Sequence, residues 1–390
     1  MALGLLVVFN QVTGYILAVR QGGIIRKRKQ LLKYAPKADL SELSFYYEES
    51  NTPIVIGEDK VSRISRNQAP LLIDKFDTPK AFLQFIKNRR EMVKGATSVV
   101  IEVEWGMGDQ IMAGEAARAL QEEYPELKIY LAANVAYHEI LKYVSPLPEL
   151  IRPSFRHPDP KSVRIGLNPT HKLWDPRGPP FGKSSFYGAH LGLEKVDQRV
   201  NFCMPGHDII ELAKKAGVNL FEIHRPLLGL HVISNSRLAS QWDTGRAMEV
   251  AKKWNDETGG DVFLIGDSAF WPAYPKYCFT IDYKSNWVTT GALILALDLF
   301  VGIDSGPMHL ARAGDIPSII LWGGSGPLDI LGREETEIDL RADLPCINNL
   351  CAACVLPTAA CMEMIEAKHV WAAIEKNWPE VVEKGRNAKY

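Results

Sequence analysis

The fold of this chain is decided by residues 299–326, LFVGIDSGPMHLARAGDIPSIILWGGSG. An apolar run over 299–303 ends in a polar turn, a helix-like segment follows, and a second apolar run over 316–322 ends in glycines. This order of strand, turn, helix and strand predicts a parallel sheet that is covered by helices. Ligands of such sheets bind beyond the carboxyl ends of the strands, which is where both turns lie.

The turn between the first strand and the helix has the features of an anion site. Ser305 and Gly306 stand where the helix begins, so the backbone N–H groups there are unpaired and carry the positive end of the helix dipole. Gly306 lets an anion approach the backbone, and Pro307 suits a first helical turn. The turn therefore predicts a phosphate site, although an ordinary capped helix explains the same residues.

The remainder of the chain divides on the same pattern. Residues 96–225 and 226–365 each alternate strand-like and helix-like segments, so we expect two doubly wound, Rossmann-like domains that face a cleft. Residues 1–95 mix short β-like runs with one helix, which predicts a small α+β N-terminal module. Residues 366–390 are expected to form a C-terminal helix. Residues 153–190 are rich in Pro, Gly, Lys and His and predict a long irregular loop.

Three segments resemble glycosyltransferase family 9, the heptosyltransferase-like family. The segment GIDSGPMHLARAGDIPSIILWGGS, residues 302–325, is similar to the family's nucleotide-diphosphate loop. The segment TSVVIEVEWGMGDQIMAGEAARALQEEYP, residues 97–125, is similar to its opening strand, Gly-x-Gly-Asp loop and first helix. Cys351-Ala-Ala-Cys354, followed by Cys361, resembles the cysteine-containing tail of many members. The resemblance implies the GT-B architecture and an inverting transfer of a sugar, with a heptose as one candidate, from a nucleoside-diphosphate sugar.

Asp109 is the candidate catalytic residue. It closes the sequence Gly106-Met107-Gly108-Asp109, which lacks the third glycine of a dinucleotide fingerprint and so disfavours a nicotinamide enzyme. An aspartate at this position could cap the helix. It could also act as the general base that takes the proton of the acceptor hydroxyl. The resemblance favours the base, because Asp109 matches the family's catalytic aspartate, and one residue can serve both purposes.

The leaving nucleoside diphosphate must be stabilised by a divalent metal or by fixed donors and cations. The chain has no Asp-x-Asp pair, so we expect transfer without a catalytic metal or other cofactor. Where the family has a lysine just before Trp242, this chain has Gln241, which leaves Arg237 as the candidate cation. The nucleotide-sugar-binding residues that the resemblance implies are Gly106, Gly108, Arg237, Trp242, Asp304, Ser305, Gly306, Pro307, Met308, His309, Gly323 and Ser325.

Four cysteines lie close together near the end of the chain, Cys346, Cys351, Cys354 and Cys361. Four thiolates can close a tetrahedral zinc or iron site, and the first three have the spacing of plant-type ferredoxins. Free thiols or one disulfide is the alternative. A metal at this place would be structural, because four thiolates leave no open position for a substrate.

Composition restricts the partners. The chain has 390 residues and a net charge of −1, so it has no overall attraction to nucleic acid or to an anionic membrane. The apolar stretch 3–19 is interrupted by polar residues and follows no basic residue, so we expect a β-hairpin over 4–20 rather than a signal peptide or a membrane span. We therefore expect a cytoplasmic protein.

Two classes of function stay open. The resemblance implies a glycosyltransferase whose acceptor is a glycan, a protein or another hydroxyl compound. A non-catalytic binding or structural protein on a GT-B scaffold is the alternative, favoured by the missing lysine and by the added N-terminal module. That module is interpreted as a homo-oligomer surface, an acceptor-binding element or a structural lid.

Overall fold

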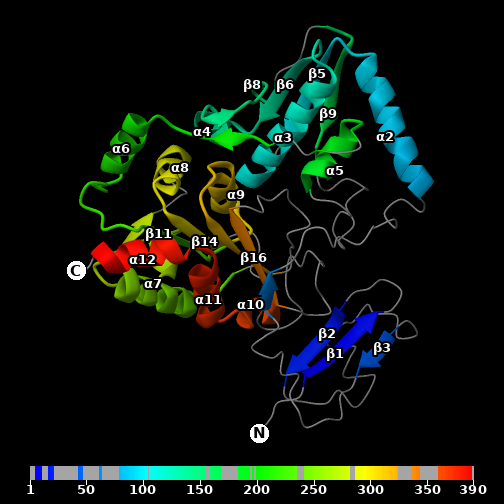
Figure 1. Cartoon of the computed structure of the whole chain (residues 1–390). Helices are drawn as coiled ribbons and strands as arrows, with labels where there is room; N and C mark the ends of the chain where they lie inside the picture. The colour runs from blue at the N-terminus through cyan, green and yellow to red at the C-terminus, as the bar shows by residue number, and fades with distance from the viewer. Residues whose placement is uncertain are drawn as a thin grey trace.

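Two sheets form the centre of the molecule (Figure 1). All strands of the first sheet are parallel, and in the second only the edge strand β4 is antiparallel to its neighbour. The first has four strands in the order β8-β6-β5-β9, and the second has seven in the order β13-β12-β11-β14-β15-β16-β4. The computed structural model describes residues 5–10, 16–21, 43–46, 61–63, 79–103, 105–154, 159–167, 183–193, 196, 199–234, 241–281, 286–323, 336–342 and 359–388.

The two central strands of the first sheet are buried because they are almost continuously apolar. Its strands are β5 (Ser98–Val103), β6 (Lys128–Ala133), β8 (Glu149–Ile151) and β9 (Ser162–Gly166). Five of the six side chains of β5 are buried, as expected for a central parallel strand. The helices of this unit are α2 (Pro79–Lys94), α3 (Met107–Glu123), α4 (His138–Leu141) and α5 (Lys183–His190), with a short helix η3 (Val135–Tyr137) after β6.

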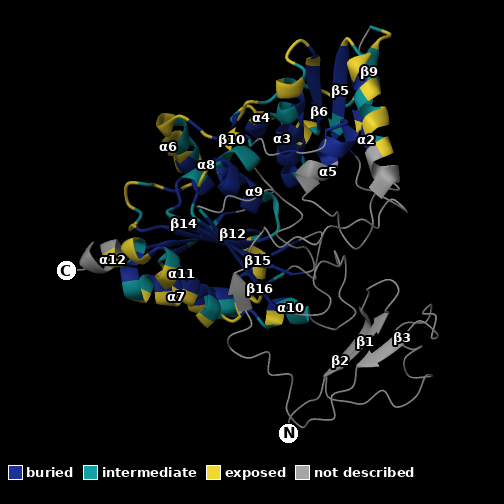
Figure 2. Ribbon diagram, turned by 45° about the vertical axis from the view of Figure 1, so that its right-hand side comes forward, coloured by how far each residue is buried: buried dark blue, intermediate teal, exposed yellow. Residues whose placement is uncertain are grey.

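The second sheet repeats this design with more strands. Its strands are β11 (Leu228–His231), β12 (Val262–Ile265), β13 (Cys278–Ile281), β14 (Leu299–Ile303), β15 (Ser318–Trp322) and β16 (Glu337–Ala342). Every residue of β11, β12, β14 and β15 is buried, and Figure 2 shows the central strands of both sheets in dark blue. Helices must therefore cover both faces of this sheet as well.

The helices divide between the two faces of the second sheet (Figure 1). One face carries α7 (Thr244–Thr258), α11 (Ala367–Asn377) and α12 (Pro379–Ala388). The other carries α8 (Trp287–Leu295) and α9 (Gly306–Ala313). Local sequence sets the ends of α7: the Asp243 side chain accepts a hydrogen bond from the Arg246 N–H at 2.9 Å, and Gly259 adopts the left-handed conformation that ends helices.

One apolar core joins the two units. It contains Val99 of β5 and Ile111 of α3, and it continues to Phe300 of β14, Leu310 of α9 and Trp322 of β15. The face of the second sheet that carries α8 and α9 therefore packs towards the first unit. The carboxyl end of β5 leads into α3 and that of β14 leads into α9, so the two loops of interest lie on this shared side.

The N-terminal strands confirm the predicted hairpin. Strand β1 (Leu5–Asn10) pairs antiparallel with β2 (Ile16–Gln21) and with β3 (Leu43–Tyr46). Strand β4 (Val61–Arg63) pairs antiparallel with β16, so a segment of the predicted N-terminal module extends the second sheet. The remaining short elements are β7 (Val144–Ser145), β10 (Asn201–Phe202), α6 (Gly206–Lys215), η5 (Ser268–Phe270) and α10 (Ala360–Glu363).

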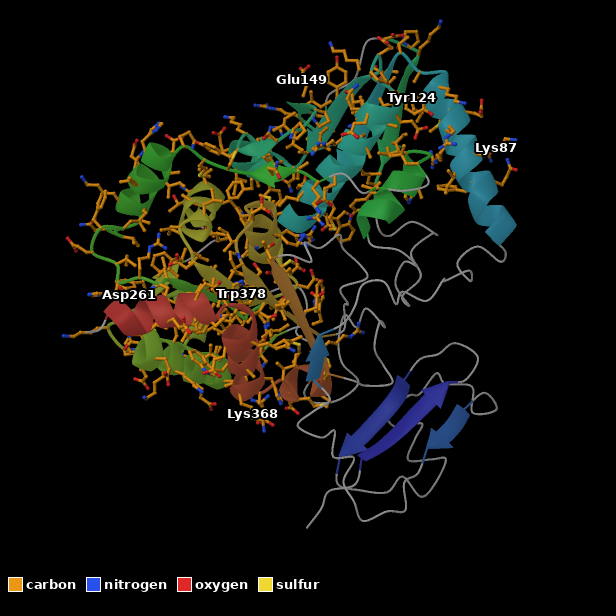
Figure 3. All side chains as sticks on the ribbon, viewed as in Figure 1. Lys87, Tyr124, Glu149, Asp261, Lys368 and Trp378 are labelled. Atoms are coloured by element: carbon orange, nitrogen blue, oxygen red, sulfur yellow. The ribbon has the colours of Figure 1, made fainter. Side chains whose placement is uncertain are left out.

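Three sequence predictions differ from the structure. The expected loop 153–190 contains strand β9 and helix α5. The expected single C-terminal helix is two helices, because Pro379 disfavours the helical conformation at Trp378, which is labelled in Figure 3. Helix α6, expected in the first domain, packs against α8 of the second. No helix among the described residues is long and apolar enough to cross a membrane.

Candidate active site

The starts of α3 and α9 meet between the two units. A Cβ atom placed on Gly108 would lie 2.2 Å from Cδ2 and 2.6 Å from Nε2 of His309. No side chain fits in that space, so glycine at position 108 permits the two helices to touch. The structure thus brings together the two segments that were chosen separately from the sequence.

Gly306 lies in a second close contact of the same kind. A Cβ atom there would lie 2.7 Å from the ring of Trp287 and 3.2 Å from Cβ of Met107. The sequence assigned Gly306 to the approach of an anion, and the structure adds a packing reason for glycine, because Trp287 of α8 and Met107 of α3 occupy the space beside it. Both glycines therefore serve the apposition of the two units.

Asp109 lies in the first turn of α3, and its carboxylate has a hydrogen-bond partner in the same unit. The Tyr187 hydroxyl of α5 donates a hydrogen bond to Oδ1 of Asp109 at 2.8 Å. The N-cap residue of α3 is Gly106 and Asp109 is the third residue of the helix, so the interpretation of Asp109 as the N-cap residue is wrong. Asp109 is half-buried, whereas Tyr187 is fully buried. A buried donor of this kind can orient the carboxylate.

Tyr137 lies near this carboxylate, and Trp287 packs against Tyr137. Burial raises the pKa of the Tyr137 hydroxyl, and the negative charge of Asp109 raises it further, which places Tyr137 within electrostatic reach of Asp109. The ring of Tyr137 packs edge-to-face against Trp287, with centroids 5.6 Å apart. Trp287 comes from the second unit, so this ring contact joins the two units next to Asp109's neighbour Tyr137.

The start of α9 combines a side-chain cap with a buried histidine. The Ser305 hydroxyl accepts a hydrogen bond from the Met308 N–H at 3.4 Å. The side chain of His309 is 4% exposed, and its Nε2 lies 3.8 Å from Oδ1 of Asp304. No described residue offers a hydrogen bond to Nδ1 of His309. Such an orphaned buried atom is unusual and favours a ligand partner. Pro307 is buried, and the Met308 side chain is fully buried in the core, so Met308 can face a ligand only through its backbone.

Trp242 lies on the other face of the second sheet. Its side chain is 2% exposed, its indole N–H donates to the carbonyl of Ile365 at 2.6 Å, and it lines a cavity of about 370 Å³ with Phe270 and Met362. The Gln241 amide, at the position of the missing lysine, donates to the carbonyl of Ser234. Gly323 is buried directly after β15.

Several predicted residues lie outside the described part of the chain: Arg237, Ser325, Cys346, Cys351 and Cys354. Cys361 is described, half-buried on α10, and it packs against the core of the second unit. Among the residues that the structure describes, no group of His, Cys, Asp and Glu comes together as a metal site.

Sequence reasoning missed the aromatic residues of the site. Tyr187 was overlooked because the stretch before it is rich in proline and glycine and reads as a loop. Tyr137 and Trp287 were overlooked because aromatic residues at helix starts are common and nothing in their spacing points to Asp109. Only the apposition of the two units identifies them.

One family model matches part of the chain. Residues 277–359 match the model of glycosyltransferase family 9 (heptosyltransferase), which confirms the resemblance and includes the α9 loop. No curated protein matches the sequence.

Solved structures resemble the chain in fold. Heptosyltransferase II of E. coli, an ADP-heptose LPS enzyme, is 16% identical with a TM-score of 0.57, covering 73% of this chain and 99% of its own. A family 9 glycosyl transferase of Veillonella parvula is 16% identical with a TM-score of 0.54, covering 73% and 98%. The dodecameric iron-containing heptosyltransferase TibC, from enterotoxigenic E. coli, was solved with ADP-D-β-D-heptose; it is 14% identical with a TM-score of 0.54, covering 97% and 92%. The predicted GT-B architecture is confirmed.

Proposed function

We propose that this glycosyltransferase moves a sugar from a nucleoside-diphosphate sugar to a hydroxyl acceptor, with inversion and without a catalytic metal ion. One observation carries the proposal: Asp109, oriented by Tyr187, lies on the helix start that touches the α9 start through Gly108 and His309. This contact supports a base on one unit that faces a diphosphate loop on the other.

The reaction is a single displacement. The carboxylate of Asp109 accepts the proton of the acceptor hydroxyl while that oxygen attacks the anomeric carbon of the sugar. The bond from the anomeric carbon to the diphosphate oxygen breaks, and its electron pair leaves with the nucleoside diphosphate. Attack opposite to the leaving group inverts the configuration.

The leaving group is assigned to the α9 start. Its backbone N–H groups and helix dipole favour negative charge, and Nδ1 of His309 is a buried atom that has no hydrogen-bond partner among the described residues. Arg237 remains the candidate cation for the diphosphate. The absence of any Asp-x-Asp pair from the sequence supports a route without metal.

The donor class is a heptose on adenosine diphosphate. Support comes from the family match and from the fold neighbours, whose titles name ADP-heptose and ADP-D-β-D-heptose. The acceptor class is a glycan or a protein side chain. Incubation with ADP-heptose and candidate glycan and protein acceptors, with and without a chelator, tests the proposal through release of adenosine diphosphate. Equal release in both conditions is expected. Loss of release in the chelator, from protein whose circular dichroism spectrum is unchanged, would overturn the metal-free route.

A non-catalytic protein on the same scaffold is the competing function, and the missing lysine before Trp242 favours it. Such a protein would bind adenosine diphosphate or its sugar without consuming it. Binding of ADP-heptose with no release of adenosine diphosphate, in the presence of candidate glycan and protein acceptors, would support this alternative and contradict the transferase.

The cysteine segment is proposed to hold one structural zinc or iron ion through Cys346, Cys351, Cys354 and Cys361. The four thiols and their spacing support the site, as does the likeness to TibC, which its title describes as iron-containing. TibC is also described as dodecameric, which supports a homo-oligomer of this chain through residues 1–95. Elemental analysis and light scattering test these two proposals. Less than half an equivalent of metal would overturn the first, and a monomer the second.

A further inference from the structure

Behind the contact between Gly108 and His309 lies a buried cluster of three charges. Nη2 of Arg312 on α9 lies 3.4 Å from Oε1 of Glu115 on α3, and Nε of Arg312 lies 3.7 Å from Oε2 of Glu337 on β16. The three side chains are 4%, 3% and 1% exposed, respectively. Arg312 therefore bridges its own sheet and the first unit with two different nitrogen atoms.

On α3 and α9 the surroundings of the cluster are mostly apolar, whereas β16 also buries Asp339 and Arg341. Glu115 interrupts the stretch 111–117, which is otherwise free of polar side chains and fully buried in α3. Arg312 is likewise buried with every residue of α9 from Pro307 to Ala313. Bringing such charges out of water costs several kcal/mol per ion, so this cluster adds little net stability. The cluster is better explained as a device that fixes positions, because a planar guanidinium holds two carboxylates in fixed directions.

The cluster is connected to the active site by rigid helices. Glu115 follows Asp109 by six positions on α3, and Arg312 follows His309 by three positions on α9. With a rise of about 1.5 Å per residue, these spacings are roughly 9 Å and 5 Å along the two helix axes. A tie between Glu115 and Arg312 therefore fixes the position of the base relative to the α9 start.

We propose that Arg312 is a positioning residue that ties α3 to α9 through Glu115, with Glu337 orienting its guanidinium, and so holds Asp109 against the diphosphate loop. The inference rests on the proposed function for its effect on transfer, but not for its effect on the contact between the helices. Small displacements of a base from its productive position are costly, since about 1 Å of misplacement can reduce a rate by roughly a hundredfold.

Two matched variants test the tie. Glu115→Gln removes the carboxylate that crosses between the units, and Glu337→Gln removes the one that does not. Both have the same change in charge and size, and both carboxylates face the same guanidinium. We expect Glu115→Gln to reduce kcat by roughly tenfold and to speed amide hydrogen exchange over residues 106–111 and 306–311. The dissociation constant of adenosine diphosphate should change by less than about twofold, because its loop belongs to one unit.

Glu337→Gln removes an orienting partner of the guanidinium but leaves the pair of Glu115 and Arg312 in place, so it should speed the exchange of both helix starts and lower kcat clearly less than Glu115→Gln does. Equal effects of the two variants, or wild-type exchange in Glu115→Gln, would overturn the proposal. If the wild-type protein transfers no sugar, the proposed function fails while the exchange measurement still decides the tie. If Glu115→Gln does not fold, Glu115→Asp, which keeps the charge but is shorter by one methylene, is measured in the same way with the same expected and overturning results.

Discussion

The starts of α3 and α9 both follow a buried strand and both contain glycine, yet they are stabilised differently. The α9 start is closed by the Ser305 hydroxyl and has Pro307 in its first turn. The α3 start has no side-chain cap and carries the Asp109 carboxylate in its first turn, where the helix dipole favours negative charge. The difference fits the two tasks of the proposed function, in which one helix start binds an anionic leaving group and the other carries the base.

Each start also depends on the other. His309 leaves no space for a side chain at Gly108 of α3. Trp287 and Met107 likewise leave no space for one at Gly306 of α9. Neither start could be moved to an isolated domain unchanged. Four substitutions, taken from the largest expected effect to the smallest, test this comparison.

Asp109→Asn tests the assignment of the base to α3. The amide oxygen can still accept the Tyr187 hydroxyl, so the fold should persist, but an amide cannot take the proton of the acceptor. We expect the release of adenosine diphosphate from ADP-heptose to slow by about a thousandfold, within the usual range for a general base. Asp208→Asn, which changes a carboxylate that faces Tyr143 at 3.4 Å, is the control and should keep its rate. A near wild-type rate in Asp109→Asn would place the base elsewhere.

Gly108→Ala tests the contact between the two starts. The added methyl group would overlap the His309 ring, so the helices must separate. We expect a loss of about 1–3 kcal/mol in the free energy of unfolding, measured in urea, with a rate reduction of roughly tenfold to a hundredfold. Gly166→Ala is the control, because a Cβ atom there meets nothing within 4 Å. Equal stability of the two variants would show that the contact is looser than described.

Tyr187→Phe tests a second difference between the two helix starts. The α3 start depends on the Tyr187 hydroxyl of another helix to orient Asp109, whereas the α9 start is capped by its own Ser305. The loss of one hydrogen bond to a charged group corresponds to about 1.5 kcal/mol, or roughly a tenfold lower kcat. Tyr143→Phe removes the same hydroxyl from the Asp208 carboxylate outside the site and should leave kcat unchanged. Steady-state kinetics of both variants would decide, and equal values of kcat would remove Tyr187 from the mechanism.

His231 of β11, next to the strand that precedes α9, should make the stability of the second unit depend on pH. It lies beside Gly302 of β14, and its Nδ1 donates to the carbonyl of Ile265 at 2.9 Å. Burial lowers the pKa of His231 from 6.5 to about 4. Below its ordinary pKa the unfolded chain binds a proton that the folded chain does not, so stability falls as the pH falls from 6.5 towards 4.

Between about pH 7.5 and about pH 5, His231 should therefore remove about 2 kcal/mol of unfolding free energy. His231→Asn, whose amide can keep the bond to Ile265 but does not titrate, should lose correspondingly less over the same interval. Urea unfolding at the two pH values measures the difference. The same acid loss in both proteins would assign the sensitivity to other groups.

The sequence alone was sufficient for features that depend on neighbours along the chain. The hairpin over β1 and β2 and the strand and helix order around β14 and α9 follow from local patterns, whereas Asp109 and His309 were chosen because their segments resemble a known family. Apolar runs, polar turns and glycines are recognisable in sequence because strands and helices are set by residues close together in the chain.

Only the tertiary structure decided which of these features meet. The contact of Gly108 with His309 joins residues far apart in sequence, and the hydroxyl of Tyr187 reaches Asp109 from a stretch that reads as a loop. Nothing in the sequence around Arg312 distinguishes it from an exposed arginine on a helix, so its burial between Glu115 and Glu337 could not be predicted. Such contacts depend on how two separately folded sheets pack, and that packing is a sum over many side chains that no short segment contains.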